Sequence, residues 1–440
     1  MARRNLYSFW SGPSAAFCSH SDTTMTEKLY YGWIIVIACN LVACITWDVT
    51  IFNQGVFAAY WIREFGWSPA TLALAPTLFQ LWAGVAGVFV GRSVDHWGPK
   101  PVILIGAVFI CVALAAIARV AAAWQAIPAF LLMGTGFACI HTVTLGKIVA
   151  RWFLAQRARA MAAATFGAGF GGAALVPLNA GLIEAYGIEA GCLALAIVTL
   201  VVLIPMALWV IKDGPESMGL EIDNGAPPAP EEAARVDNDT ATWTLAGAMA
   251  RPAFWALALA LGFGMLAQSA YLYHQTPFHE GRLGLLGAAG VVSATTLAGI
   301  AGRVIFITLG PRLSTLKWTT LVFGLQALSF AILGFGESEA ALWGGSILFG
   351  ATMGLVITLQ PLTVAQAFGR TSFGRIYGAI YFAIRAGAAV GPIAIGLMLV
   401  EGFGYADGWL LVALSLIVAA LLLPAALRAS KPSSPSQTSA

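Results

Sequence analysis

The sequence contains very little charge. Asp, Glu, Lys and Arg make up 10% of its 440 residues, whereas hydrophobic residues make up 59% and the mean hydropathy is +0.82. A soluble domain carries about 25% charged residues, so this shortage excludes an ordinary globular enzyme and indicates a polytopic α-helical membrane protein. The net charge is only +3 and the basic residues are spread over short loops, so we expect no nucleic-acid partner.

Motifs of catalysis and of metal binding are also missing. The six cysteines form no CxxC pair and no cluster with histidines at metal-ligand spacing, so we expect no metal and no cofactor. The sequence has no P-loop and no GxSxG motif. Neither ATP-driven transport nor covalent catalysis therefore has a candidate site, and we predict that the protein is not an enzyme.

The N-terminal residues lack the core of a cleaved signal peptide. Residues 1–24 are polar and are broken by Gly and Pro, whereas a signal peptide needs a continuous run of about 7–15 apolar residues. We expect residues 1–29 to form a disordered cytoplasmic tail, with Met25 as a plausible true start. We expect residues 428–440 to form a second disordered cytoplasmic tail.

Long apolar runs, by contrast, are abundant. A helix of about 20 apolar residues crosses a bilayer, and hydropathy predicts twelve such spans in this chain. Between the sixth and seventh, residues 212–251 form a Pro/Ala/acidic cytoplasmic linker with too little apolar content to fold alone. This linker separates two expected six-helix halves, residues 30–211 and 252–427. The twelve expected spans are residues 31–60, 70–91, 101–121, 126–149, 158–183, 188–211, 252–276, 284–309, 317–336, 340–367, 374–400 and 405–427.

The distribution of Lys and Arg predicts the orientation. With the N-terminus inside, 17 of the 23 Lys and Arg residues fall in inner segments and only Arg63, Arg119 and Arg282 fall in outer loops. Positive residues concentrate on the cytoplasmic side of membrane proteins. We therefore expect a multi-pass inner-membrane protein with both termini in the cytoplasm.

A weak internal repeat relates the two halves. Arg159 opens the fifth span, a Gly/Ala-rich run that contains Pro177, and Arg375 opens the similarly small-residue-rich eleventh span, which contains Pro392. Small residues at close spacing let membrane helices pack tightly. Two related halves are typical of a transporter that rocks about a central site, although Gly and Ala are common in membrane helices generally.

Two arginines inside apolar runs predict an anion site. Arg303 is the only charge between residues 285 and 309, and such a charge costs about 2.5 kcal/mol or more to insert unless it faces a cavity or the bundle interior. Arg385 is placed similarly in the eleventh span. A carboxylate accepts two parallel hydrogen bonds from one guanidinium. The alternative is that each arginine is structural or snorkels to the interface.

Other polar residues within the spans are candidates for coupling or binding. Asp48 is the only acidic residue deep in a span, so it is a candidate proton site or a charge partner for an arginine. Histidines titrate near neutral pH, which makes His141 and His274 further candidates, although a lone membrane histidine is more often a satisfied hydrogen-bonding group. The remaining candidates would line the substrate cavity: Asn53, Gln54, Tyr271 and Tyr381.

The segment after the second span carries a recognisable motif. It resembles the signature loop of the major facilitator superfamily, G-x-x-x-D-x-x-G-x-[R/K], at four positions: Gly91, Asp95, Gly98 and Lys100. Ser93 and His96 stand where that family usually has Leu and Arg. Glycines permit a tight turn, and an aspartate can lie at the positive end of a neighbouring helix. The resemblance implies the twelve-helix fold of a secondary transporter.

Finer features resemble the monocarboxylate and oxalate:formate branch of that superfamily. They are the stretch 64–68 (EFGWS), the segment 212–220 (KDGPESMGL) and the stretches 251–255 and 274–278 on either side of the seventh span. In that branch an arginine in the eighth span is associated with the substrate carboxylate, and Arg303 occupies its place. An aspartate expected four residues earlier is Gly299 here. A second cation expected in the eleventh span corresponds to Arg385, with a one-residue difference in spacing from Tyr381.

The sequence thus predicts a monomeric secondary transporter that moves a small organic anion, a mono- or dicarboxylate, by proton symport or anion exchange. Two alternatives from other classes remain. One is an efflux pump for neutral or cationic compounds, which an arginine-lined cavity disfavours. The other is a ligand sensor without transport, which no appended signalling domain supports.

Overall fold

The computed structural model describes residues 30–154, 156–225, 243–309, 314–369 and 372–429. Both predicted tails lie largely or wholly outside these residues, as does the middle of the predicted linker. Within the described chain every regular element is helical, and eleven helices are long and apolar enough to cross a membrane. The predicted all-α membrane fold is therefore confirmed. The number is eleven because the predicted seventh and eighth spans continue into one another as a single helix, α12.

The first half of the chain contains the six predicted N-terminal spans. Its first span is one continuous rod in which a π-helical turn, η1, joins α1 to α2. The elements are α1 (Tyr31–Trp47), η1 (Asp48–Phe52), α2 (Asn53–Phe65), α3 (Pro69–Trp97), α4 (Pro99–Ile117), η2 (Ala123–Gln125), α5 (Ala126–Ile140), α6 (Thr142–Trp152), α7 (Arg157–Phe166), α8 (Ala168–Tyr186), α9 (Ile188–Pro205) and η3 (Met206–Val210).

The second half contains the remaining spans. The 58-residue helix α12 contains both the seventh and the eighth span, and it turns sharply at Gly284, whose φ of 67° is open to glycine but strained for other residues. Residues 277–283, predicted as a loop, are helical in the structure. The elements are α11 (Leu245–Met249), α12 (Pro252–Leu309), α13 (Thr315–Phe335), α14 (Glu339–Phe368), α15 (Phe373–Val400) and α16 (Tyr405–Ala429).

Two predicted spans are divided in the structure. The fourth breaks at His141, whose backbone angles (φ −85°, ψ −107°) are not helical, so that α5 ends and α6 begins there. The fifth divides into α7 and α8 at Gly167. A side chain at residue 167 would collide with the backbone of Asn40 on α1, so glycine permits the close approach of these helices. A hydropathy profile cannot detect either break, because the residues around both are apolar.

The described parts of the linker pack on the halves that they adjoin. Residues 212–225 form two short turns, η4 (Pro215–Met218) and η5 (Ile222–Gly225), and Asp223 accepts a hydrogen bond from the backbone of Leu154 over 2.7 Å. On the other side, Trp243 packs edge-on against Phe368 at the end of α14. These described parts of the linker are therefore held by contacts with the two halves. We call the end of the bundle where they lie the linker end.

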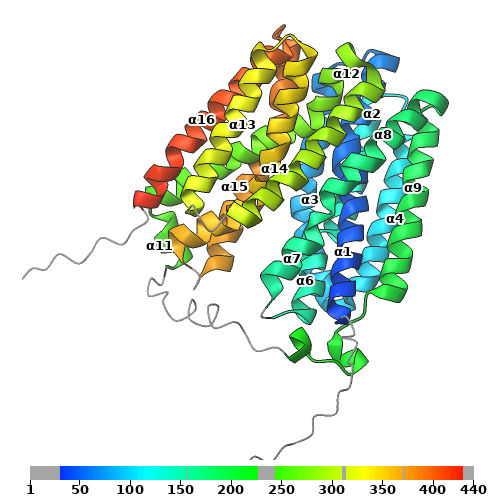
Figure 1. Cartoon of the computed structure of the whole chain (residues 1–440). Coiled ribbons are helices and arrows are strands. Elements are labelled where there is room, and N and C mark those ends of the chain that lie inside the picture. The colour runs from blue at the N-terminus through cyan, green and yellow to red at the C-terminus, as the bar shows by residue number, and fades with distance from the viewer. Residues whose placement is uncertain (1–29, 155, 226–242, 310–313, 370–371, 430–440) are drawn as a thin grey trace, which may run out of the picture.

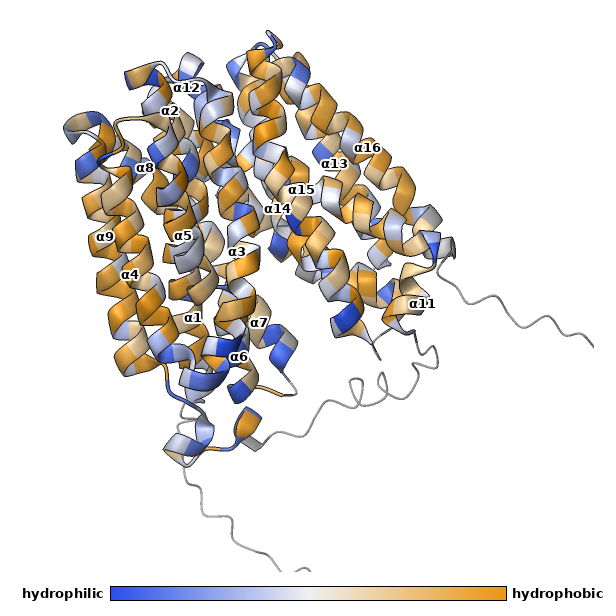
Figure 2. Cartoon of the chain, turned by 180° about the vertical axis from the view of Figure 1, so that it is seen from behind, coloured by the Kyte–Doolittle hydropathy of each residue, from blue (hydrophilic) through white to orange (hydrophobic). Residues whose placement is uncertain are grey.

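The two halves contact each other through helices that include the repeat-related fifth and eleventh spans, α8 and α15. Helix α3 packs along α15, and α12 packs along α8 and α2. Thr77 donates a hydrogen bond to the carbonyl of Ala389 over 2.8 Å, and Ser293 donates one to the carbonyl of Ala173 over 2.8 Å. Figures 1 and 2 show the two groups converging at the end opposite the linker and separating towards the linker end.

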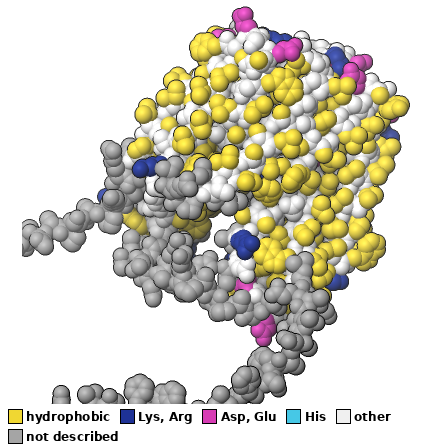
Figure 3. All heavy atoms as spheres, viewed as in Figure 1, with side chains coloured by type: hydrophobic (Ala, Val, Ile, Leu, Met, Phe, Trp, Pro, Cys, Tyr) yellow, Lys and Arg dark blue, Asp and Glu magenta, His cyan; other side chains and the backbone are white. Residues whose placement is uncertain are grey.

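The outer surface of the bundle is apolar, as a bilayer requires. Large hydrophobic side chains such as Val88, Val201 and Leu421 are more than half exposed. Figure 3 shows hydrophobic side chains across the flank of the helices, with the charged side chains gathered towards the two ends. Such a surface is stable only when lipid covers it, which agrees with a multi-pass membrane protein.

Candidate functional site

A cavity of about 1340 Å³ lies between the two halves. Helices of both halves supply its walls, and its lining extends to Trp33, Val36 and Arg159 near the linker-end starts of α1 and α7. At the opposite end the halves are in contact. There Arg63 of α2 pairs with Glu280 of α12 over 3.2 Å. The cavity is therefore positioned to be reached from the linker end.

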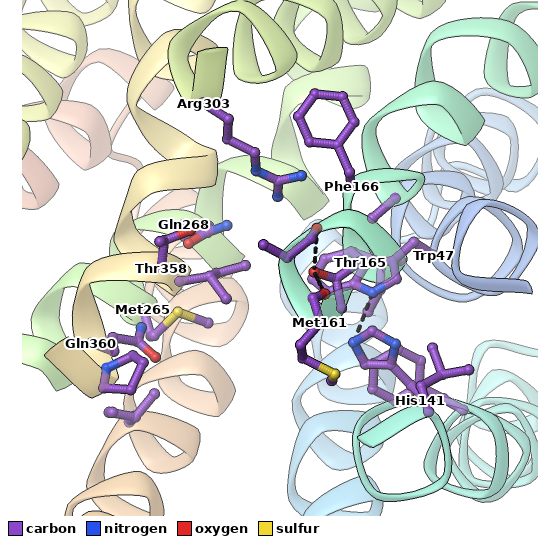
Figure 4. Close-up of a pocket in the computed structure, with 18 of the residues that line it drawn as sticks. Trp47, His141, Met161, Thr165, Phe166, Met265, Gln268, Arg303, Thr358 and Gln360 are labelled. Carbon is purple, nitrogen blue, oxygen red and sulfur yellow. Dashed lines mark hydrogen bonds between the residues drawn. The ribbon is translucent and has the colours of Figure 1, made fainter. Parts of the chain in front are cut away.

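Arg303 projects from α12 into this cavity (Figure 4). Its side chain passes over Gly354 of α14, where a β-carbon would come within 2.5 Å of the Arg303 Nε atom. Its guanidinium lies over the ring of Phe166 at 5.8 Å from the ring centroid. Phe166 belongs to α7 of the other half, so this cation–π contact spans the cavity.

Arg385 enters the same cavity from α15. It donates a hydrogen bond through Nη1 to Oε1 of Gln80 on α3 over 3.1 Å, and its guanidinium lies over the ring of Tyr381 at 5.3 Å. Its buried Nε atom has no hydrogen-bond partner among the described residues. The arginine thus retains donors for a ligand while neutral groups hold it in place.

The charge of the cavity lining is of one sign. Arg159, Arg303 and Arg385 line it, whereas no Asp or Glu occurs among the described residues that do so. In the described chain, none of the three arginines lies within 4.0 Å of a carboxylate oxygen, since the ion pairs found there involve other cations. A wall with uncompensated guanidiniums attracts anions and repels cations.

His141 lines the cavity at the break between α5 and α6. Trp47 of α1 donates its indole N–H to His141 Nε2 over 2.9 Å, as Figure 4 shows. That bond fixes the tautomer in which Nδ1 carries the proton, and the buried Nδ1 has no partner in the described chain. The histidine is therefore positioned by the first span and retains one unused donor.

Asp48 lies behind the cavity wall instead of in it. Its side chain is fully buried in the π-helical turn, and Oδ2 accepts a hydrogen bond from Asn53 Nδ2 over 3.1 Å. Asn53 in turn accepts one from Asn179 of α8 over 2.6 Å. Neither Asp48 nor Asn53 is among the cavity-lining residues, whereas Gln54, one residue on, is. Oδ1 of Asp48 has no partner in the described chain.

Two further sequence candidates are placed away from the cavity. Tyr271 is fully buried among aromatic rings of the second half and donates a hydrogen bond to Ser346 over 2.6 Å. His274 is also fully buried, and its Nε2 lies 2.8 Å from the carbonyl oxygen of Pro392. Both polar groups therefore hold helices together and do not line the cavity. Tyr381 lines the cavity as expected from the sequence.

Gly299, where carriers of the resembling branch have an aspartate, is a packing position in this structure. A β-carbon there would come within 3.1 Å of the carbonyl oxygen of Gly350 on α14. The position faces a neighbouring helix at close range, so a carboxylate would not fit without separating α12 from α14. Helix packing therefore accounts for the glycine.

The signature motif lies mostly in a helix. Gly91 and Asp95 belong to α3, which continues to Trp97, so the prediction of a loop is wrong before Gly98. Asp95 pairs with Lys147 of α6 over 2.6 Å instead of lying at a helix N-terminus. Lys100 pairs with Asp213 over 3.3 Å. These contacts tie α3 and α4 to neighbouring segments at the linker end.

Sequence reasoning missed several lining residues. Arg159 lies among the inner basic residues and opens a repeated span, and these two roles do not indicate that it lines a cavity. Apolar and aromatic lining residues carry no sequence signal that separates them from ordinary core. Those that the sequence did not single out include Trp33, Met161, Phe166, Met265 and Tyr377. Within the described chain no three His, Cys, Asp or Glu residues are grouped so that they could hold a metal ion.

Comparisons with known proteins agree with this architecture. Residues 37–392 match the model of the Major Facilitator Superfamily. The uncharacterized MFS-type transporter YhjX of Escherichia coli (strain K12) is 25% identical over 251 residues, which is 54% of this chain and 56% of that protein. The match therefore spans little more than half the length of that relative.

Solved structures with a similar fold include a bacterial homologue of the human lysosomal transporter Spinster. In an inward-facing and occupied conformation it has a TM-score of 0.64 at 16% identity, over 92% of this chain and 99% of its own. In an inward-facing and unoccupied conformation the TM-score is 0.61 at 14% identity, over 92% and 97%. Identities this low show the fold alone. Because the family model covers most of the chain, the protein belongs to the Major Facilitator Superfamily and is a multi-pass membrane transporter, not an enzyme.

Proposed function

We propose that this transporter carries a small organic anion, a mono- or dicarboxylate, across the inner membrane by alternating access. The observation that carries the proposal is the lining of the central cavity, where Arg303 and Arg385 occur without an acidic partner among the described lining residues. A guanidinium in a low-dielectric site is stabilised by an anion, and its planar fork fits a carboxylate through two hydrogen bonds.

The geometry supports a role for both arginines in one site. Arg303 and Arg385 come from different helices of the second half, and each contacts a neutral group of the first half, Phe166 and Gln80. A carboxylate offers each guanidinium a stronger partner than an aromatic ring or an amide. Trp47, Tyr377 and Tyr381 line the same space and would contact the organic part of the substrate.

The proposed orientation places the linker end in the cytoplasm. It rests on the excess of Lys and Arg in the segments of that end. In this orientation the cavity is accessible from the cytoplasm and the Arg63–Glu280 pair closes the outer side. The sequence features shared with the monocarboxylate and oxalate:formate branch support the same substrate class.

Two coupling modes fit the proposal. In proton symport, Asp48 or His141 would bind the proton, and in anion exchange no proton is needed. The absence of an acid at Gly299 agrees with exchange, whereas the buried carboxyl of Asp48 agrees with symport. We propose that the transporter acts as a monomer whose only ligands are the anion and, under symport, protons.

A panel of carboxylates tests the proposal. The purified protein in proteoliposomes is assayed for uptake of radiolabelled acetate, oxalate, succinate and benzoate, with and without an imposed pH gradient. Matched experiments use benzamide and benzylamine, which keep the organic body but are neutral or cationic. We expect uptake of at least one carboxylate and of neither control. Uptake of the amine alone would support an efflux pump, and binding of a carboxylate without flux would support a sensor.

A further inference from the structure

A third arginine faces the cavity from the opposite half. Arg159 lies in the first turn of α7, and its side chain is exposed to the cavity that Arg303 and Arg385 line. Arg157, two residues earlier on the same helix, is also exposed but does not line the cavity. Two residues rotate a helix by about 200°, so the two arginines lie on different faces. The excess of basic residues in the cytoplasmic segments requires only a cation at the linker end. It does not explain why Arg159 faces the cavity.

The Arg159 guanidinium is held without being neutralised. It lies over the ring of Trp33 on α1, at 5.4 Å from the ring centroid. In the described chain no carboxylate oxygen lies within 4.0 Å of it. A cation–π contact uses the face of the guanidinium and leaves the N–H groups at its edge free to donate. The residue is thus pre-positioned for an anion.

Arg159 and Arg303 are connected through one helix. Phe166, which lies beneath the Arg303 guanidinium, is seven residues after Arg159 on α7. Seven residues are almost two full turns, so Arg159 and Phe166 share a face and are separated by about 10 Å along the axis. Helix α7 therefore presents a cation near the linker-end mouth and an aromatic platform deeper in the cavity.

We propose that Arg159 is a carboxylate-binding residue contributed by the first half. It receives the anion at the linker-end mouth and holds it together with Arg303 as the halves close. The inference rests on the proposed function and adds that both halves provide a guanidinium. A substrate held by one half alone would give no force for closure, whereas an anion shared between the halves stabilises the closed state by differential binding.

Binding measurements on the full-length protein in detergent test this inference. The probes are sodium succinate and sodium benzoate, with succinamide and benzamide as uncharged counterparts, and affinities come from titration calorimetry. We expect Arg159→Gln to weaken binding of the better carboxylate about tenfold or more, the loss expected for a charge-assisted hydrogen bond. Arg159→Lys should recover part of it, because the charge returns without the planar fork.

The matched control is Arg157→Gln, which changes net charge and helix equally but leaves the cavity intact. We expect it to bind like wild type. Wild-type affinity in Arg159→Gln, together with weakened binding in Arg303→Gln, overturns the inference and leaves the proposed function standing. Failure of the wild-type protein to bind either carboxylate removes both. Equal weakening by Arg157→Gln and Arg159→Gln would show a general charge effect and also contradict the role of Arg159.

Discussion

Arg385 donates a hydrogen bond to Gln80 across the central cavity, over 3.1 Å between Nη1 and Oε1. The bond joins α15 of the second half to α3 of the first, and Thr77 of α3 also donates a hydrogen bond to the carbonyl of Ala389 on α15. A neutral amide holds the arginine without cancelling its charge. The pair therefore keeps a cation available while linking the two halves that must move against each other.

The charge at residue 80 should control anion affinity. Gln80→Glu places a carboxylate beside Arg385, and this internal anion would compete with the substrate. We expect the KM for carboxylate uptake to rise about tenfold or more, whereas Gln80→Leu, which removes the hydrogen bond without adding charge, should change it less. Uptake into proteoliposomes measures both. An unchanged KM in Gln80→Glu would show that Arg385 is not a substrate ligand.

Two glycines near Arg303 should respond differently to alanine. The methyl of Gly354→Ala would lie within 2.5 Å of Arg303 Nε, a flexible side chain that can move aside, so we expect weaker carboxylate binding with little loss of stability. Gly302→Ala would meet the backbone carbonyl of Ala351, which cannot yield in the same way. We expect it to cost about 1–3 kcal/mol and to lower Tm. Scanning fluorimetry and uptake, measured on both variants, check this contrast.

The ion pair at the end opposite the linker should bias the conformational equilibrium. Arg63 and Glu280 connect α2 to α12, and their side chains are 42% and 14% exposed. A partly exposed pair is worth about 0.2–1 kcal/mol, so Arg63→Glu should shift the population only severalfold towards a state open at this end. Spin labels at Tyr186 and Phe403 would report a longer mean distance by pulsed electron resonance.

The charge-swapped double variant, Arg63→Glu with Glu280→Arg, is the control. It should restore the wild-type distance distribution, because the pair is rebuilt with its charges exchanged. A distribution in Arg63→Glu identical to wild type would mean that apolar packing alone closes this end.

Substitution of Asp48 should show whether proton coupling can be lost while carboxylate binding is retained. It lies behind the cavity wall and is hydrogen-bonded by Asn53, so Asp48→Asn leaves the cavity lining unchanged. Under proton symport through Asp48, we expect this variant to exchange carboxylates at a rate near wild type and to lose accumulation driven by a pH gradient. Accumulation that persists would exclude Asp48 as the proton site. Lost exchange in a folded variant would show that Asp48 also supports binding.

Much of the fold could be predicted because apolar length is a direct consequence of bilayer thickness. The interruptions within the predicted spans could not be predicted in this way. Gly167 lies at the division of one span, where α1 approaches closely, and His141 interrupts another inside an apolar run. The helix also continues through Pro277 to Gly284, beyond the apolar run. The breaks at Gly167 and His141 involve contacts between segments distant in sequence.

Residues of the candidate site could be predicted where their residue type is rare within the membrane spans. Arg303 and Arg385 stood out because charge is rare in these spans, and both line the cavity. Asp48 was equally unusual in sequence, and Tyr271 was a polar candidate, but both side chains are directed to other neighbours. Arg159 was hidden because its position among inner basic residues already had a sufficient explanation.

Whether the two arginines form an anion site is tested by carboxylate uptake into proteoliposomes that contain Arg303→Ala or Arg385→Ala, each compared with wild type at equal amounts of folded protein. Folding is verified by size-exclusion chromatography and Tm. We expect each single substitution to abolish uptake of the carboxylate that the wild-type protein transports. Full uptake by folded Arg303→Ala would contradict the anion site.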